Sequence, residues 1–478
     1  MKQQLTLPLL DLVLLVAAYT LGYSLADAAR RALGFSDPDY GLLDGPIERH
    51  AIFALVALAL TFWLSVVRRH AARRLPFWEM LRDILVAVFF AALCDAATMY
   101  MMKLPFARLA WALGWTSTLV LLPLGRHLAT TLLIMFGKWR RPVLLVGDGA
   151  NALAAWLAIE SDRFMGYEVA RLVVLSQVPA TNSLLLLAGR RNIPVSVGIE
   201  GIDQLVLLHP GVRIVVALQP EEAASQPEIM QTLSKYDDDL IIAPPLRGLP
   251  LYGTEPLFFF SHEVLLLRTR NNLAQWLPAR IKRLFDLLVS TAGLLAIAPI
   301  LVWIIIRIRA DGGPAIFAHQ RIGQAGKVFW CYKFRTMVMN SDEVLARLLD
   351  SDLEANAEWA KDFKLRSDPR ITKIGNFLRK TSLDELPQLL NVVKGEMSLV
   401  GPRPIVDEEL SRYGADARYY LEAKPGITGL WQISGRNHLD YSRRVMLDTW
   451  YVKNWSLWHD VVIILKTIPI VLRRDGAY

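Results

Sequence analysis

The sequence predicts three regions in order: a membrane α-helical bundle, an α/β domain with a parallel sheet, and an α+β domain that a proline-broken, re-entrant membrane helix holds at the membrane. Three observations lead to this fold class. Long apolar stretches fill the first part of the chain, strand and helix patterns then alternate, and a fifth apolar run with basic residues on both sides follows. Hydrophobic residues make up 53% of the 478 residues, more than in an average soluble protein, so part of the chain should lie in a membrane.

Four apolar stretches predict a transmembrane bundle over residues 1–137. Each is close to the roughly 20 residues that a membrane helix needs. The first is similar to a signal peptide, but its apolar run is longer and contains Asp11, so we expect a retained helix. The four stretches are Leu5–Ala26, Ala51–Val67, Ile84–Met102 and Leu109–Phe136.

Charged residues around these stretches predict their orientation. Arginines and lysines gather between the second and third stretches and after the fourth, whereas acidic residues dominate between the first and second. Because basic loops stay in the cytoplasm, we expect both ends of the bundle, and everything after it, on the cytoplasmic face. Charges within or near the spans can be functional or simply paired; they are Asp95, Arg126 and His127.

Net charge and cysteine usage limit the partners and the setting. The formal net charge of +8 favours anionic partners, which are lipid head groups, phosphorylated substrates or nucleic acid. The two cysteines, Cys94 and Cys331, cannot form a disulfide framework, which excludes a stapled secreted domain.

A Rossmann-like α/β domain is predicted over residues 138–250. Pro142–Gly149 reads PVLLVGDG, a buried-strand run that ends in a glycine-rich turn of the kind that can hold a pyrophosphate. The dinucleotide fingerprint also needs an acidic residue at the end of the second strand, where this chain reads LVVLSQV, so we expect a module that no longer binds a dinucleotide. Further strands, alternating with helix patterns, are expected at Ala170–Leu175, Val195–Val197, Val212–Ala217 and Leu240–Ala243.

A linker over residues 251–278 leads to a fifth apolar run, Leu284–Ile306, which has basic clusters on both sides. Such clusters conflict with a simple membrane crossing. Pro299 interrupts the run, and a proline inside a helix removes a hydrogen bond and bends the chain. We expect a re-entrant helix over residues 280–309 that enters and leaves through one face. The alternative is a fifth true span, which would place the rest of the chain outside the cell.

Two extended runs joined by a glycine-bounded turn predict a β-hairpin whose second strand contains Lys333 and Arg335. At the strand period of two these side chains project from one face. They could clamp a phosphate there, since arginine binds bidentately and lysine acts as a point charge. A solvated strand face is the alternative.

The stretch SLDELPQ, which begins at Ser382, opens a helix with an apolar stripe at i, i+3, i+4 and i+7. Ser382 and Glu385 fit a capping box. However, Pro387 fits the first turn, whose N–H groups lack partners, only if the helix begins near Asp384. We therefore expect Asp384 at the helix tip, where the N-terminus stabilises an ionised carboxylate and attracts phosphate.

A carboxylate at such a tip can act as a nucleophile toward a phosphoryl group. Because two anions repel, the attack needs Mg²⁺, which one or two carboxylates and the substrate phosphates usually hold. Glu385 is placed to supply one ligand, and Arg403, between two prolines, approaches on restricted backbone. An ordinary capped surface helix is the alternative.

An ordered series of motifs resembles the polyprenyl-phosphate hexose-1-phosphate transferases, the monotopic phosphoglycosyl transferases of bacteria. The series runs from about Ala279 to the C-terminus, and the helical and α/β regions before it resemble the large form of the family. Within the family, the undecaprenyl-phosphate galactose phosphotransferases are the nearest resemblance. The motifs are Lys282-Arg283-x-Phe285-Asp286, Lys333-Phe-Arg335-Thr-Met, Asp368-x-Arg370-x-Thr372-x-x-Gly375, Ser382-Leu-Asp384-Glu385-Leu-Pro387-Gln388, Met397-Ser-Leu-Val-Gly401-Pro-Arg403-Pro404, Lys424-Pro-Gly-Ile-Thr-Gly429-Leu-Trp431-Gln432 and Tyr451-Val-x-Asn454-Trp455-Ser456.

The resemblance implies a catalytic domain over residues 279–478 that acts in the bacterial inner membrane, on its cytoplasmic face. It implies ping-pong transfer of a sugar-1-phosphate from a UDP-sugar, with UDP-galactose the best match, to undecaprenyl phosphate, through a covalent aspartyl phospho-sugar. Asp384 would be the nucleophile, and Glu385 would help to hold Mg²⁺. The resemblance also implies a homodimer, and it implies no nucleic-acid partner. Phosphates would be bound by Lys333, Arg335, Arg379 and Arg403.

Two other classes of function remain open from the sequence. The glycine-rich turn would fit a membrane-tethered, nucleotide-dependent sugar oxidoreductase or epimerase. Four spans and an empty α/β module would fit a non-catalytic scaffold for polysaccharide assembly.

Overall fold

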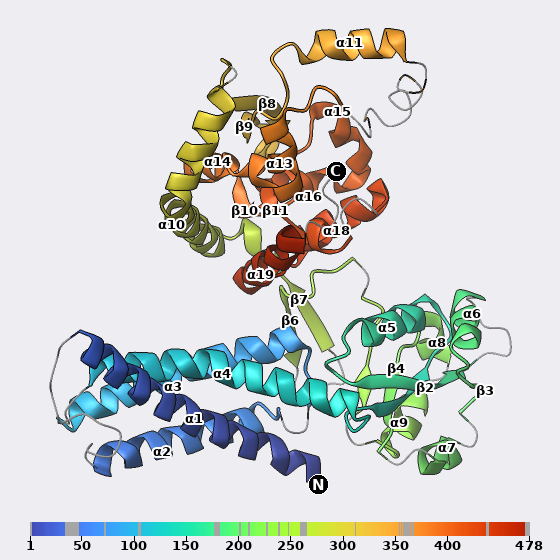
Figure 1. Cartoon of the computed structure of the whole chain (residues 1–478). Coiled ribbons are helices and arrows are strands. Elements are labelled where there is room, and N and C mark those ends of the chain that lie inside the picture. Colours follow the sequence, from blue (N-terminus) through green and yellow to red (C-terminus); the bar gives the residue numbers. More distant parts are fainter. Residues whose placement is uncertain are drawn as a thin grey trace. The chain divides into compact units, whose positions relative to one another are not determined.

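The computed structural model comprises two compact units, Met1–Arg247 and Gly248–Tyr478. Figure 1 shows the helices and strands of both units along the chain. The structure describes residues 2–33, 47–70, 73–103, 107–175, 182–199, 202–208, 211–225, 228–237, 240–246, 248–258, 265–310, 312–352, 368–435 and 439–473, together with 354, 356 and 365.

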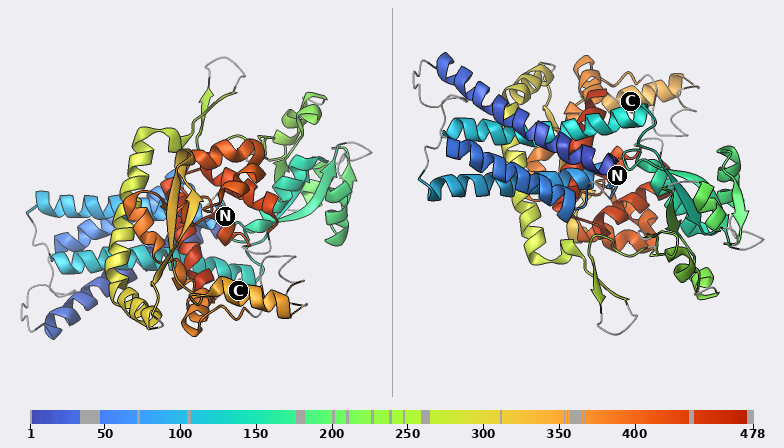
Figure 2. Two further views of the ribbon diagram at one scale, coloured as in Figure 1. Left: turned by 90° about the horizontal axis from the view of Figure 1, so that it is seen from above. Right: turned by 90° about the horizontal axis from the view of Figure 1, so that it is seen from below.

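The first unit begins with the predicted bundle of apolar helices, which Figure 2 shows in two further views. Within the described ranges, the helices long and apolar enough to cross a membrane include these four and one in the second unit. Their shared core contains Leu15, Leu60, Ile84 and Trp115. The existence of the four helices is therefore confirmed. Their bounds are α1 Lys2–Ala32, α2 Ile47–Phe62 continued by the π-turn η2 Trp63–Val67, α3 Phe77–Met101 and α4 Arg108–Met135.

Asp11, Arg126 and Asp95, which lie inside the bundle, have polar partners within the protein. Asp11 and Arg126 are fully buried and form a bidentate ion pair, and Arg126 also lies 2.8 Å from the Nδ1 atom of His70. The indole of Trp115 donates to Asp95 at 2.9 Å. Such pairs satisfy charges that would otherwise be costly in an apolar environment.

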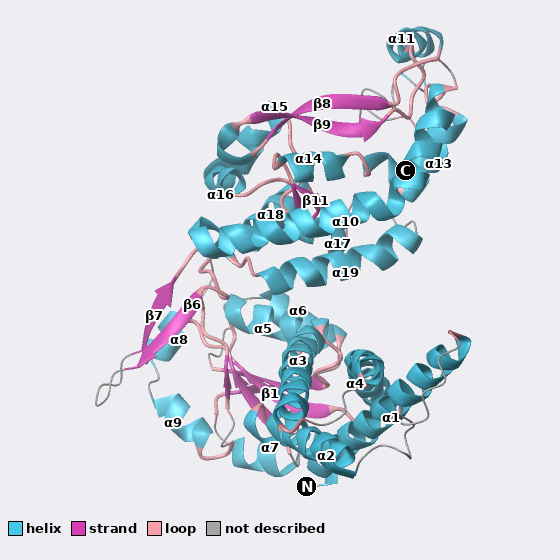
Figure 3. Ribbon diagram, turned by 90° about the vertical axis from the view of Figure 1, so that its left-hand side faces the viewer, coloured by secondary structure: helices cyan, strands magenta, loops and turns pink. Residues whose placement is uncertain are grey.

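The second part of this unit is a parallel sheet with strand order β3-β2-β1-β4-β5. Alternate residues of β1 face opposite sides: Leu145 packs under α5 and α6, whereas Leu144 packs against α7 and α9. The predicted parallel α/β domain is thus confirmed (Figure 3). The elements are β1 Arg141–Val146, α5 Ala150–Ser161, β2 Tyr167–Val174, α6 Asn182–Arg190, β3 Val195–Val197, α7 Ile202–Leu208, β4 Arg213–Val216, α8 Pro220–Ser225, α9 Glu228–Ser234 and β5 Ile241–Ile242.

The second unit joins small sheets to short helices around one long apolar helix. The antiparallel β8–β9 pair is the predicted hairpin. The elements are β6 Thr254–Phe258, β7 Leu265–Thr269, η3 Asn272–Ala274, α10 Trp276–Arg309, β8 Ile316–Ile322, η4 Gln324–Gly326, β9 Val328–Phe334, α11 Ser341–Ser351, α13 Lys373–Thr381, η5 Leu383–Glu385, α14 Gln388–Lys394, β10 Ser398–Val400, α15 Asp407–Leu410, η6 Ser411–Asp416, α16 Ala417–Glu422, β11 Gly426–Thr428, α17 Leu430–Ile433, α18 Tyr441–Lys453 and α19 Leu457–Arg473.

The long helix α10 is continuous across Pro299, so the proline does not end the helix as the expected break would. A single missing hydrogen bond can bend a helix without stopping it. Both ends of α10 pack against this same unit. Near its start, Lys282 donates to Asp460 at 2.6 Å, and near its end Ile304 and Ile308 lie in a core cluster with Phe334.

Candidate active site

The turn that carries the two adjacent carboxylates is a 3₁₀ turn, η5. Helix α13 ends at Ser382, whose left-handed backbone (φ 55°) redirects the chain into this turn. The α-helix α14 begins at Gln388, with Pro387 at its N-cap. The helical backbone continues from this turn through Leu386 and Pro387 into α14, so Asp384 lies in the turn that leads into the helix, four residues before Gln388. Ser382 makes no side-chain capping bond to the described backbone, so the capping box does not form.

A side chain in α14 fixes this turn against the hairpin. Asn391 is completely buried; its oxygen accepts from the Tyr332 amide at 3.1 Å and its nitrogen donates to the Trp330 carbonyl at 2.7 Å. The Asn391 side chain thus bonds the backbone of β9 as a neighbouring strand would. Arg283 of α10 donates to the last carbonyls of α14, those of Val392 and Val393, at 2.5 and 2.7 Å. The sequence reasoning missed Asn391, although a lone amide inside an apolar stripe was a visible signal.

The three predicted residues Asp384, Glu385 and Lys333 meet at this turn. Lys333 Nζ donates to Glu385 Oε1 at 2.7 Å. Burial, followed by the negative charge of Glu385, raises the pKa of Asp384 to about 6, against the opposing effect of Lys333. Burial alone would lower the pKa of Lys333, but Glu385 outweighs it and the pKa is raised. The site therefore holds two neighbouring carboxylates, one of which is paired with the ammonium of Lys333.

Arg379 and Arg335 differ in how their guanidinium groups are used. Arg379 Nε donates to the Thr336 hydroxyl at 2.9 Å, and its side chain lines the same cavity as Asp384. Arg335 is 8% exposed and donates to the carbonyls of Pro314 and Ile308 at 2.8 and 3.1 Å. It therefore caps the carbonyl end of α10, whose last carbonyls have no helical partner. Arg335 also lines the same cavity as Lys333, so the phosphate clamp that the sequence predicts for these two residues stays a prediction.

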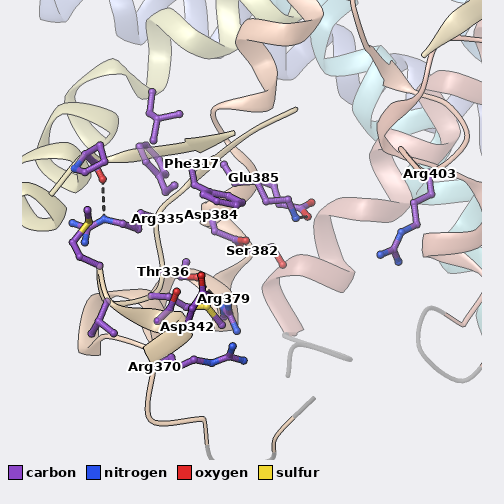
Figure 4. A pocket seen from close by; sticks show the side chains of 18 of the residues that line it. Phe317, Arg335, Thr336, Asp342, Arg370, Arg379, Ser382, Asp384, Glu385 and Arg403 are labelled. Carbon is purple, nitrogen blue, oxygen red and sulfur yellow. Dashed lines mark hydrogen bonds and ion pairs between the residues drawn. The ribbon is translucent and has the colours of Figure 1, made fainter. Parts of the chain in front are cut away.

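Arg403 lies across the cavity from Asp384 and Arg379 (Figure 4). Its guanidinium is 5.4 Å from the ring of Trp431, and the guanidinium of Arg444 is 4.6 Å from the same ring. Two cations on one indole are attracted by the ring quadrupole, which holds both in place.

A buried carboxyl lies behind this pair of arginines. Asp448 is 2% exposed, accepts from the Tyr413 hydroxyl at 2.8 Å and interacts with the backbone amide of Arg403. Burial raises the pKa of Asp448 to about 7, and the Tyr413 hydrogen bond and both arginines oppose the rise. Trp431 belongs to a recognised motif of the sequence, but neither Arg444 nor Asp448 could be singled out without the packing.

These walls enclose a cavity of about 870 Å³. Its size suits a ligand larger than a single sugar or nucleobase. Asp384, Glu385, Lys333, Arg379 and Arg403 all line it, so the structure brings together the predicted residues of the site. Lys333 and Arg379 therefore lie on the side of the carboxylate pair, and Arg403 faces that pair across a space of ligand size (Figure 4).

The carboxylate pair also fits a divalent cation. Among the described residues, no group of three or more His, Cys, Asp or Glu side chains forms a complete protein cage. Mg²⁺ seldom needs one, because it keeps water and takes substrate phosphates as ligands. Burial is the main cause of the raised pKa of Asp384, and repulsion from Glu385 adds to it. A cation next to Glu385 would relieve that repulsion.

The glycine-rich turn of the α/β domain is filled by its own side chains. With its amide oriented as the hydrogen bonds require, Gln219 accepts from the backbone amides of Ala150 and Asn151 at 2.7 and 2.9 Å. These are the first N–H groups of α5, where a pyrophosphate would bind. Asp148 is buried and hydrogen-bonds Glu222; burial and then this bond raise the pKa of Glu222 to about 7. An acidic, already capped turn is unsuited to an anionic phosphate.

Comparison with known proteins places this site in a family. Residues 277–474 match the family model described as bacterial sugar transferase. The chain is 46% identical over 437 residues to the undecaprenyl-phosphate galactose phosphotransferase of Salmonella typhimurium, which covers 91% of this chain and 89% of that protein. It is 41% identical to the UDP-galactose-lipid carrier transferase of Erwinia amylovora over 99% of this chain and 97% of the relative.

A shorter relative matches less than half of the chain. The exopolysaccharide production protein ExoY of Sinorhizobium fredii is 50% identical over 198 residues, 41% of this chain and 88% of that protein. A pocket that combines two carboxylates with basic side chains is compatible with transfer of a phosphate-bearing group. The chain belongs to the bacterial sugar transferase family, the polyprenyl-phosphate hexose-1-phosphate transferases, and is a phosphotransferase associated with the membrane.

Proposed function

We propose that this protein transfers a sugar-1-phosphate, with galactose as the sugar, from a UDP-sugar to undecaprenyl phosphate, as the first membrane step of O-antigen, capsule or exopolysaccharide synthesis. The products are undecaprenyl-diphospho-sugar and UMP. The observation that carries the proposal is the single cavity in which Asp384 and Glu385 face Lys333, Arg379 and Arg403. The names of the relatives support the galactose donor and the lipid acceptor.

The proposed mechanism has two displacements at one phosphorus. A carboxylate oxygen of Asp384 attacks the phosphorus that bears the sugar, the bond from that phosphorus to the bridging oxygen breaks, and UMP leaves. The phosphate oxygen of undecaprenyl phosphate then attacks the same phosphorus, and the Asp384 carboxylate leaves. Both steps conserve the phosphate ester of the sugar, so no oxidant or further reactant is needed.

Basic residues support this chemistry by neutralising phosphate charge. Arg379 lies on the Asp384 side of the cavity and Arg403 on the other (Figure 4). Lys333 is hydrogen-bonded to Glu385, so a diphosphate in the cavity meets cations from both directions. Glu385, with the substrate phosphates, would hold Mg²⁺, which supplies charge neutralisation when bound. Arg335 lines the same cavity and also fixes the end of α10, so it is proposed to support phosphate binding.

The re-entrant arrangement of α10 and the cytoplasmic location of the site are part of the proposal. Contacts of both ends of α10 with one compact unit support it, since a helix that crossed the bilayer would separate its ends. The apolar side chains of α19, such as Ile468 and Leu472, are exposed and suit an interfacial helix. A cysteine introduced near Gly435 should be labelled only from the cytoplasmic side of bacterial inner-membrane vesicles; labelling from the periplasmic side would show a true fifth span.

The direct test of function is transfer of radiolabelled sugar phosphate from UDP-galactose to undecaprenyl phosphate with Mg²⁺. Lipid-linked product is expected with the unchanged protein and not with Asp384→Asn. Undiminished turnover of Asp384→Asn would refute the nucleophile. Analysis of the lipid product from a panel of UDP-sugars would show whether galactose is the preferred sugar.

The dinucleotide-dependent alternative is disfavoured by the filled turn at Gln219. We propose that the α/β domain is a Rossmann-like module without a dinucleotide. Titration of the full chain with NADH should show no binding, whereas saturable binding would revive the oxidoreductase hypothesis. The expected homodimer would appear as twice the chain mass in detergent-corrected light scattering.

A further inference from the structure

One rim of the active-site cavity is apolar and exposed, unlike the basic walls. Ile316, Phe317 and Met339 line the cavity together with Asp384. Their exposed fractions are 40%, 53% and 62%. We call these three residues the apolar rim. Large apolar side chains gathered at the mouth of a charged cavity indicate contact with an apolar part of a ligand.

The apolar rim lies directly beside the charged centre. In the antiparallel register of β8 and β9, Phe317 is the cross-strand partner of Lys333. Directly opposed residues have Cβ atoms about 5 Å apart. Since Lys333 is bonded to Glu385 at 2.7 Å, a phosphate near this ammonium would have its ester substituent within reach of the Phe317 ring.

The apolar rim also adjoins the end of the long apolar helix. Ile316 pairs with Phe334, and Phe334 packs with Ile304 and Ile308 of α10. Arg335 ties the same strand to the carbonyl of Ile308 at 3.1 Å. The rim is thus fixed where the membrane helix meets the cavity.

We propose that the apolar rim binds the first isoprene units of the polyprenyl phosphate acceptor while its phosphate lies toward Lys333. This inference rests on the proposed function and assigns a subsite within it. An acceptor of this kind joins an anionic phosphate directly to an apolar chain. The protein presents a matching pair of groups, since the cationic Lys333 and the apolar Phe317 are directly opposite each other on neighbouring strands. The branched and thioether side chains of Ile316 and Met339 suit a hydrocarbon, whereas Arg403 faces the cavity from the opposite wall.

The experiment separates the two half-reactions of the full-length protein in lipid nanodiscs. Formation of the covalent phospho-sugar with UDP-galactose alone reports on the donor. Transfer to undecaprenyl phosphate, compared with a two-isoprene phosphate, reports on the acceptor. Phe317→Ser should raise KM for undecaprenyl phosphate about tenfold, since part of an aromatic contact is lost, and leave the rate of adduct formation unchanged.

Two further variants make the test specific. Phe317→Leu keeps an apolar side chain and should restore most of the affinity for the lipid. Val328→Ser is the matched control, because Val328 is 59% exposed on the same hairpin but does not line the cavity; its KM should not change.

Three results would overturn the inference. These are an unchanged KM in Phe317→Ser, an equal loss with Val328→Ser, or a fall in adduct formation that matches the fall in transfer, which would assign Phe317 to the nucleotide. Failure of the proposed function is a separate result, since the unchanged protein would then make no lipid-linked product.

Discussion

Two short turns of this protein carry the residue types that phosphate chemistry uses, and their surroundings differ. The glycine-rich turn of the α/β domain precedes α5, and Gln219 already accepts from its first amides. The turn with Asp384 lines a cavity of about 870 Å³ with cationic side chains around it. One turn is closed by its own chain, and the other is open to a ligand.

The comparison shows that a sequence motif forms a binding site only when it borders an open cavity and when the nearby charges complement the ligand. Asp148 and Glu222 add acidic groups to a turn that would have to receive an anion. In contrast, the negative pair Asp384 and Glu385 is offset by Lys333. The predictions below test the open turn first and the closed turn last.

The largest effect is expected for Asp384→Asn, because an amide cannot form the acyl phosphate. Sugar-phosphate transfer should fall by at least about a thousandfold. Asp342→Asn is the matched control, since Asp342 is a further carboxylate, besides Asp384 and Glu385, in the lining of the cavity. Comparable losses in both variants would mean that general cavity charge, and not nucleophilic attack, is responsible.

Next in size is Glu385→Gln, which removes a metal ligand and the partner of Lys333. Transfer at saturating Mg²⁺ should fall about a hundredfold, and half-maximal activity should need more Mg²⁺. Chelation with EDTA should abolish transfer by the unchanged protein. Glu343→Gln serves as control, because Glu343 pairs with Arg347 on the exposed face of α11. An unaltered Mg²⁺ requirement in Glu385→Gln would refute the role as ligand.

Loss of the indole between the two arginines should have a smaller effect. Trp431→Leu should raise KM for the UDP-sugar about tenfold with little change in kcat, because Arg403 loses its cation–π support. Trp431→Phe should retain most of the affinity. Tyr419→Leu removes an aromatic ring from beside Arg418, outside the cavity, and should leave KM unchanged. A fall in kcat alone would argue against a role in donor binding.

Asp448 should make stability depend on pH. Its pKa rises from the usual 3.8 to about 7 on folding, so between these values the folded state binds more protons than the unfolded state. The stability that Asp448 contributes through its protonated form is fully present below pH 3.8 and is lost as the pH rises through 7. Tyr413, Arg444 and Arg403 are the titratable and charged groups that face it. In detergent, Asp448→Asn should flatten the decline of Tm between pH 5.5 and about 8; an unchanged slope would contradict this.

The smallest effect on catalysis is expected at the closed turn. Gln219→Ala frees the amides of Ala150 and Asn151 and should cost about 1 kcal/mol of stability, as for a lost helix cap. Transferase activity should be unchanged, whereas the exposed Gln231→Ala should alter neither property. A large loss of transfer in Gln219→Ala would show that the α/β domain communicates with the active site.

Local patterns were sufficient to predict much of the fold. Long apolar runs predicted the four helices, and alternating strand and helix patterns predicted the parallel sheet, because both signals depend on neighbours in the sequence. The 3₁₀ form of the turn that leads into α14 was not predicted, since this turn and the left-handed backbone of Ser382 depend on packing. The region predicted as a linker contains the antiparallel strands β6 and β7. The residues between these strands, 259–264, lie outside the described residues.

The sequence predicted the residues that carry the chemistry of the site, but it did not predict the buried residues that hold them in position. Asp384, Glu385, Lys333 and Arg403 could be chosen by residue type and motif. The capping of α10 by Arg335 could not be predicted, because it depends on the position of the Ile308 carbonyl in the folded protein. Asn391 and Asp448 act through buried contacts with distant segments, which no spacing in the sequence reveals.

The covalent intermediate is the most direct test of the central claim. Intact-protein mass spectrometry after incubation with UDP-galactose and Mg²⁺, without lipid acceptor, should show the added mass of one hexose phosphate. Peptide mapping should place it on Asp384, and addition of undecaprenyl phosphate should remove it. Turnover without any adduct, or an adduct on another residue, would contradict the account.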